Sequence, residues 1–129
     1  MALKETVAEA ITQIRERFDG HEVHVREDSE GGAFVTVDEL EVGQLYTQKA
    51  TWLGARIVCT YPYADVYPHF CRGDLSRVDG RGLGDGTSAA TWEEKAAIQL
   101  SRRSNHLDPE LDRADLKFLK VLEWLRTHP

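Results

Sequence analysis

The stretch from Thr60 to Cys71, TYPYADVYPHFC, restricts the fold of this chain more than any other part of the sequence. It contains two of the four prolines, three of the four tyrosines and one of the two cysteines. Pro62 and Pro68 fix their own φ and bias the tyrosine before each of them toward extended backbone. We therefore expect a rigid, extended crossing that is not helical and that pairs as a strand only at its edges.

The residues before this crossing predict a helix followed by strands. Gly20 lies where a left-handed C-cap would end the helix. Polar and apolar side chains alternate over 21–26 and 33–37, which predicts a hairpin, and 44–53 and 55–60 favour two further strands. Four strands at short spacing predict an antiparallel meander. The helix is predicted by apolar residues spaced by three and four positions: Leu3, Val7, Ile11, Ile14 and Phe18.

The residues after the crossing predict a long loop and then helices. The range 73–86 holds five of the ten glycines and predicts an exposed loop. Thr91 and Glu94 have capping-box spacing, which favours a helix from 92 to about 100, with an extended conformation of 97–101 as the alternative. The pair Asp108 and Pro109 is typical of a helix start. The last helix then has one apolar face, formed by Leu111, Ala114, Phe118, Val121, Leu122 and Leu125.

The size and charge of the chain limit its class. With 129 residues, of which 41% are hydrophobic, we expect one domain over 1–129 that folds without a metal or a disulfide. The net charge of −6 argues against nucleic-acid binding, which needs a basic surface. There is neither an apolar run of membrane-spanning length nor a signal-peptide pattern, so we expect no membrane association and a cytoplasmic location, with both cysteines as free thiols.

The order of these elements, with Tyr61-Pro62 followed by Pro68-x-Phe70, resembles the ubiquitin-conjugating-enzyme (UBC-like, RWD-related) family. The stretch Ile98 to Asn105, IQLSRRSN, is similar to the C-terminal part of divergent bacterial members. The resemblance implies an α+β fold with an N-terminal helix, a four-stranded antiparallel meander, the Tyr-Pro crossing and C-terminal helices. It also implies a role in a bacterial ubiquitin-like conjugation pathway, with a ubiquitin-like modifier and an activating enzyme as partners.

The sequence lacks the residues that carry out the chemistry in this family. It has no His-Pro-Asn motif, and no cysteine follows Cys71. His69 lies two residues before Cys71 and would point to the same side of a strand, so this pair is the candidate for acyl transfer. Thr87 and Ser88 are the nucleophilic side chains of the loop where the family's cysteine would fall. The alternative is an inactive variant that only binds the modifier. Cys59, in an apolar run, is expected to be a buried structural thiol.

Two further patterns suggest binding. A Cys-His pair can also ligate zinc, and Glu94 and His106 could complete a site with Cys71 and His69. Under this alternative the chain is a small metal-binding or scaffolding protein associated with such a pathway. The hypothesis of a role in conjugation itself needs no cofactor. The polar run that contains Arg102, Arg103 and Ser104 is either a solvated connector or a docking surface for a carboxylate or an acidic tail.

Overall fold

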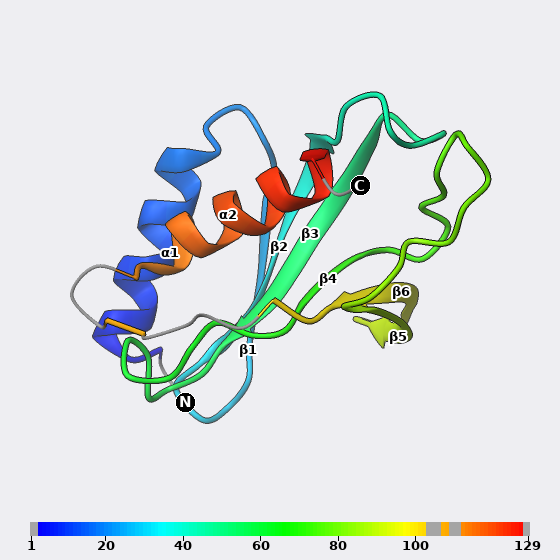
Figure 1. The fold of residues 1–129 in the computed structure, drawn as a ribbon. Helices are drawn as coiled ribbons and strands as arrows, with labels where there is room; N and C mark the ends of the chain where they lie inside the picture. The colour runs from blue at the N-terminus through cyan, green and yellow to red at the C-terminus, as the bar shows by residue number, and fades with distance from the viewer. Residues whose placement is uncertain (1–2, 103–106, 109–111, 128–129) are drawn as a thin grey trace.

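The computed structural model describes residues 3–102, 107–108 and 112–127. In chain order, the two helices and six strands are α1 (Glu5–Arg17), β1 (Val23–Glu27), β2 (Ala33–Glu41), β3 (Ala50–Ile57), β4 (His69–Arg72), β5 (Thr87–Trp92), β6 (Lys95–Leu100) and α2 (Ala114–Thr127). All strand pairs are antiparallel, and the order across the sheet is β1-β2-β3-β4-β6-β5. Figure 1 shows both helices on one face of this sheet. The expected α+β class, the N-terminal helix and the C-terminal helix are confirmed.

The core lies between the helices and this face of the sheet. Val35 and Leu53, from β2 and β3, are fully buried there with Ile14 of α1 and Phe118 of α2. Side chains alternate along each strand, so every second residue of β2 and β3 points to the opposite face, away from the helices. We call that opposite surface the open face.

The third and fourth predicted strands are in fact one strand, β3. It runs without a break through Gly54, and the expected strand at 44–49 is absent. A Cβ atom added to Gly54 would lie 2.6 Å from Nε1 of Trp92, so glycine is needed here because the indole packs against the backbone. The glycine therefore marks a close contact within the strand, where the sequence pattern predicts an interruption.

The helix expected from 92 to 100 is also wrong, because this range belongs to the β5–β6 hairpin. The extended alternative is confirmed for 97–100. Glu93 and Glu94 form the two-residue turn with φ of 48° and 67°, both in the left-handed region. The last helix begins at Ala114, later than the expected start at Asp108, whose carbonyl accepts a hydrogen bond from the Asp112 N–H (2.8 Å). Pro109 lies outside the described residues.

The crossing between β3 and β4 positions the start of α2. It contains no helix, as expected, but 59–62 form a turn where extended backbone was predicted. The Tyr61 hydroxyl accepts a hydrogen bond from the Ala114 N–H (3.0 Å), one of the donors that a helix start leaves unpaired. Asp65 pairs with the buried Lys117 of α2 (3.4 Å). The crossing therefore fixes where α2 begins on the sheet.

Candidate functional site

Cys71 and His69 lie side by side on β4 and point toward the helices. Both side chains are fully buried. Burial raises the pKa of the Cys71 thiol to about 12 and lowers the pKa of His69 to about 3. The His69 ring meets the Phe118 ring edge to face at 5.0 Å, and neither of its nitrogens has a hydrogen-bond partner among the described residues.

These environments oppose the chemistry that the pair would need. A nucleophilic cysteine needs a lowered pKa and access to the acyl donor, and a general base needs a pKa near the working pH. Here both groups are held neutral and shielded from solvent. The prediction that they share one side of the strand is confirmed, but the side they share belongs to the core.

Cys59 is the more accessible thiol, so the expectation that it is buried is wrong. It is half-buried in the turn after β3. It lines a hollow of about 420 Å³ with Lys4, Tyr61 and Pro62 among the other lining residues. Of the two hydroxyl candidates, Thr87 donates to the Gly84 carbonyl (2.7 Å), whereas Ser88 is exposed on β5.

The metal ligands suggested by the sequence are not brought together in the described part of the chain. Glu94 is exposed at the β5–β6 turn, whereas Cys71 and His69 lie in the core, and His106 falls outside the described residues. Within the described ranges, one group of three potential ligands converges, with its ligand atoms within 4.8 Å of one another: Glu22, His24 and Asp38. Its side chains pair with one another beside β1, at the surface.

The structure describes only part of the polar run that could dock a carboxylate. Arg102 is exposed, and its guanidinium carbon lies 4.9 Å from the centre of the Trp124 ring of α2. This cation–π contact uses the flat face of the guanidinium and leaves its edges available for hydrogen bonds. Arg103 and Ser104 lie outside the described residues.

The open face carries an aromatic cluster that connects three parts of the sheet. Trp92 stacks on Phe70 with ring centres 4.9 Å apart and meets the edge of Phe34 at 5.7 Å. Its Nε1 donates to the Thr36 hydroxyl (2.9 Å). Glu93, the next residue, pairs with Arg26 of β1 (3.0 Å). The tip of the β5–β6 hairpin is thereby held against the open face of β2 and β3.

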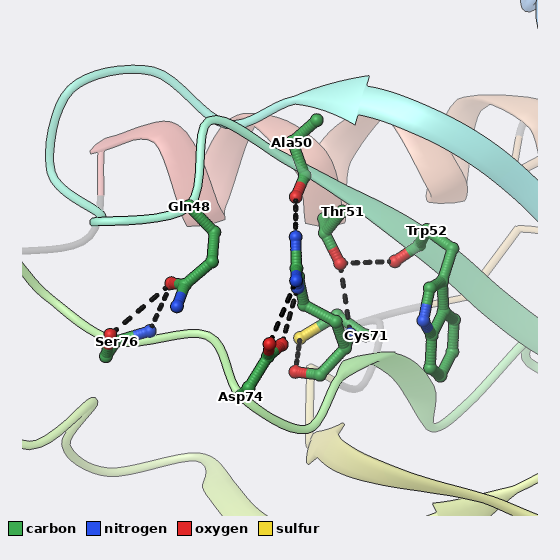
Figure 2. Close-up of polar contacts among 8 residues, drawn as sticks. Gln48, Ala50, Thr51, Trp52, Cys71, Asp74 and Ser76 are labelled. Carbon is green, nitrogen blue, oxygen red and sulfur yellow. Dashed lines mark hydrogen bonds and ion pairs between the residues drawn. The ribbon is translucent and has the colours of Figure 1, made fainter.

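Beside this tip, a polar groove of about 560 Å³ opens over the ends of β3 and β4. Figure 2 shows Ala50, Thr51, Trp52 and Asp74 from its lining, together with polar contacts of the neighbouring Gln48, Cys71 and Ser76. The Arg72 guanidinium donates to Asp74 (2.9 Å) and to the Ala50 carbonyl (3.0 Å), and the hydrogen bond from Arg72 lowers the pKa of Asp74. Nζ of Lys95 lies 4.6 Å from the centre of the Trp52 ring. The groove thus combines an aromatic side chain with charges of both signs.

A second groove of about 300 Å³ continues along the open face. It shares Asp38 and Lys95 with the first groove and reaches Arg26 and Phe34. This surface was not among the predictions from the sequence. A signal was present, because alternation along 33–37 places Phe34 and Thr36 opposite the core residues Val35 and Val37.

No family model, curated protein or solved structure matches this chain. In the described part of the chain, neither helix has the length and apolar character needed to cross a membrane.

Proposed function

We propose that this chain is a UBC-like component of a ubiquitin-like conjugation pathway that binds the modifier without carrying it as a thioester. An N-terminal helix, an antiparallel meander, a Tyr-Pro crossing and a C-terminal helix on one face of the sheet support this proposal. The observation that favours binding over carrying is the environment of Cys71, which is fully buried with its pKa raised to about 12.

The open face is the binding surface in this proposal. Its two grooves adjoin at Asp38 and Lys95, and Trp52 supplies an aromatic surface beside them. Exposed aromatic rings with nearby charged groups are typical of protein interfaces, because the rings supply contact area and the charges fix the orientation. The helices cover the other face, so the partner has access to this side of the sheet.

The experiment uses a ubiquitin-like modifier and its activating enzyme, the two partners that this proposal requires. The protein is incubated with both and with ATP, and covalent adducts are sought by intact-protein mass spectrometry without reducing agent. Non-covalent binding of the modifier is measured by calorimetry in parallel. We expect binding without an adduct. Lys95→Glu should weaken binding by about tenfold, equivalent to about 1.4 kcal/mol, whereas Cys71→Ala should leave it unchanged.

Other outcomes would assign a different role. A thiol-sensitive adduct that is lost in Cys71→Ala would show that the protein is a carrier, and one lost in Cys59→Ser would move the nucleophile to the accessible thiol. An adduct that resists thiols and disappears on mutation of Thr87 or Ser88 would indicate an oxyester. Absence of both binding and adduct would refute the proposed function.

The alternative function, a small metal-binding or scaffolding protein of such a pathway, is distinguished by its metal content. Protein purified without chelator is analysed for zinc by elemental mass spectrometry. The alternative predicts stoichiometric zinc that is lost when His69 and Cys71 are replaced. Zinc that is lost in His24→Ala instead would place the metal beside β1, where His24 contacts Asp38.

A further inference from the structure

The two edge strands of the sheet differ in how their free edges are protected. β1 carries His24, Arg26 and Glu27, and the Val23 carbonyl accepts a hydrogen bond from Arg15 of α1 (3.2 Å). β5 has the sequence TSAATW, without a charged residue or a proline, and it pairs with β6 in an unbroken register. Free edges of soluble proteins are usually protected by charges, prolines or bulges, because they can pair with another strand.

The hairpin turn determines which backbone groups of β5 point outward. A two-residue turn is closed by a hydrogen-bonded pair, here Trp92 and Lys95, and hydrogen bonding then alternates along the ladder. The Ser101 N–H donates to the Gly86 carbonyl (2.8 Å). This hydrogen bond agrees with the alternation, in which Gly86 and Ser101 form a hydrogen-bonded pair. The outward N–H and C=O groups therefore belong to Thr87, Ala89 and Thr91. No backbone hydrogen bond joins these three residues to a described residue outside the hairpin.

We propose that β5 pairs with β5 of a second copy of this chain, antiparallel and about a twofold axis at Ala89. Ala89 then faces Ala89 of the partner subunit, and Thr87 faces Thr91 of the partner subunit. These are the residues whose N–H and C=O groups point outward, so each facing pair exchanges both of its hydrogen bonds. A twofold axis perpendicular to the sheet also keeps the helix-covered faces of both copies on the same side.

The side chains of β5 fit this register. Thr87 and Thr91 form a cross-strand threonine pair, which favours pairing, and Ser88 lies opposite Ala90 of the partner subunit. Between Thr87 and Thr91 every facing side chain is small and uncharged, so these five positions of the two copies approach without steric conflict or charge repulsion. The order Thr-Ser-Ala-Ala-Thr reads almost the same in both directions around Ala89, so each half of the strand meets a half of similar size and polarity in the second copy.

Antiparallel pairing of β1 with β1 of a second copy is unfavourable. A twofold axis at Val25 would place His24 opposite Arg26 of the partner subunit, and each of these long side chains already pairs with a carboxylate of its own copy. The Arg15 side chain would also have to release the Val23 carbonyl. The second copy is therefore assigned to β5, and the two sheets form one continuous sheet with both open faces on one side. This assignment does not depend on the proposed function.

The test is the mass of the purified full chain in solution, measured by analytical ultracentrifugation from low to high micromolar concentration. We expect a concentration-dependent dimer. Ala89→Pro removes an outward N–H and no hydrogen bond to β6, so it should give a monomer with an unchanged circular dichroism spectrum. Ala89→Lys, at an exposed position, should do the same by placing two lysines opposite each other at the axis. Ala90→Pro is the control, because its N–H points toward β6 and its loss should lower the melting temperature.

A second measurement fixes the register. In a Cys59→Ser background, Ala89→Cys should form an intermolecular disulfide under mild oxidation, because facing residues of antiparallel strands lie within the Cα separation that a disulfide spans. A monomer at every concentration would overturn the proposal. A dimer that persists in both Ala89→Pro and Ala89→Lys, or that does not crosslink through Ala89→Cys, would overturn it equally.

Discussion

The two faces of the sheet are built from alternate residues of the same strands, yet they are stabilised in different ways. On β3, Leu53 points toward the helices and is fully buried, whereas its neighbour Trp52 points to the open face and remains half-buried under Lys95. The helix-covered face relies on the exclusion of water from aliphatic and aromatic side chains. The open face relies on ring stacking, cation–π contacts and ion pairs that remain accessible to a partner.

Polar groups follow the same division. Near the helices, two buried polar side chains are paired: Asp115 contacts Arg17 (3.1 Å) and Arg113 (2.7 Å), and the Tyr46 hydroxyl donates to the Leu125 carbonyl (2.6 Å). His69 is the exception, because neither of its nitrogens has a hydrogen-bond partner among the described residues. Burial raises the pKa of Asp115, but the hydrogen bonds from the two arginines outweigh it and leave the pKa lowered. On the open face the ion pairs of Arg26 with Glu93 and of Arg72 with Asp74 are partly exposed. A change on the helix-covered face should therefore cost more stability than a comparable change on the open face.

The largest difference should appear at adjacent residues of β3. Leu53→Ala leaves a cavity in the core and should lower the free energy of unfolding by about 2–5 kcal/mol. Trp52→Ala loses the buried part of a half-buried ring and the contact with Lys95, which should cost roughly 1–2 kcal/mol. Urea denaturation of both variants gives the two values. Equal costs would contradict the division between the two faces.

His69 should make the helix-covered face sensitive to acid. Burial lowers the pKa of His69 in the folded state to about 3, whereas the unfolded chain binds the proton near the ordinary value of 6.5. Between these values the unfolded state holds more protons, so stability falls as the pH drops from 6.5 toward 3. Between pH 7 and pH 5 the loss should be about 2 kcal/mol. Lys117 also lowers this pKa, and Asp65 opposes it.

The control for this effect is His69→Phe, which keeps an aromatic ring against Phe118 and cannot titrate. Urea denaturation of both proteins at pH 7 and pH 5 separates the His69 contribution from that of the carboxylates, which both proteins share. The variant should lose most of the additional decrease between pH 7 and pH 5. An identical decrease in both proteins would mean that His69 is already accessible to protons in the folded state.

The contrast between the faces also explains which parts of the fold the sequence predicted. Helix α1 and the β1–β2 hairpin follow from local periodicity, because each has a single apolar side. The interruption expected at Gly54 was wrong because the reason for that glycine is Trp92, which is distant in sequence. The β5–β6 hairpin was missed because its turn consists of Glu93 and Glu94 rather than the asparagine and glycine typical of such turns.

The candidate site shows the same limit. Alternation along β4 correctly predicted that His69 and Cys71 share one side of the strand, but only tertiary packing decides which face that side joins. Cys59 was expected in the core because it follows Ile57 and Val58, yet β3 ends at Ile57 and the turn leaves the thiol half-buried. Thiol accessibility depends on where strands end, and strand ends are the boundaries that sequence patterns locate least well.

A moderate effect is expected where the hairpin tip meets the open face. Trp92→Phe keeps an aromatic ring beside Phe70 but removes the Nε1 donor and leaves the buried Thr36 hydroxyl without that partner, which should cost about 1–2 kcal/mol. Combining it with Thr36→Val, which removes the hydroxyl, should recover part of this loss. Urea denaturation of the single and double variants measures the coupling. Additive losses would show that the hydrogen bond contributes nothing.

The smallest effect should come from the ion pair at the same tip. Glu93 pairs with Arg26 across a distance of 3.0 Å, and the Arg26 side chain is 60% exposed, so solvent weakens the attraction. Glu93→Gln keeps the shape of the side chain and removes its charge, which should cost roughly 0.2–1 kcal/mol at low salt and less at high salt. Glu94→Gln is the matched control, because Glu94 occupies the same turn with a positive φ and has no ion pair in the described part of the chain. If urea denaturation shows the same change for both variants, the effect belongs to the net charge of the turn. If only Glu93→Gln loses stability and the loss shrinks with added salt, the pair with Arg26 helps to hold the hairpin tip against the open face.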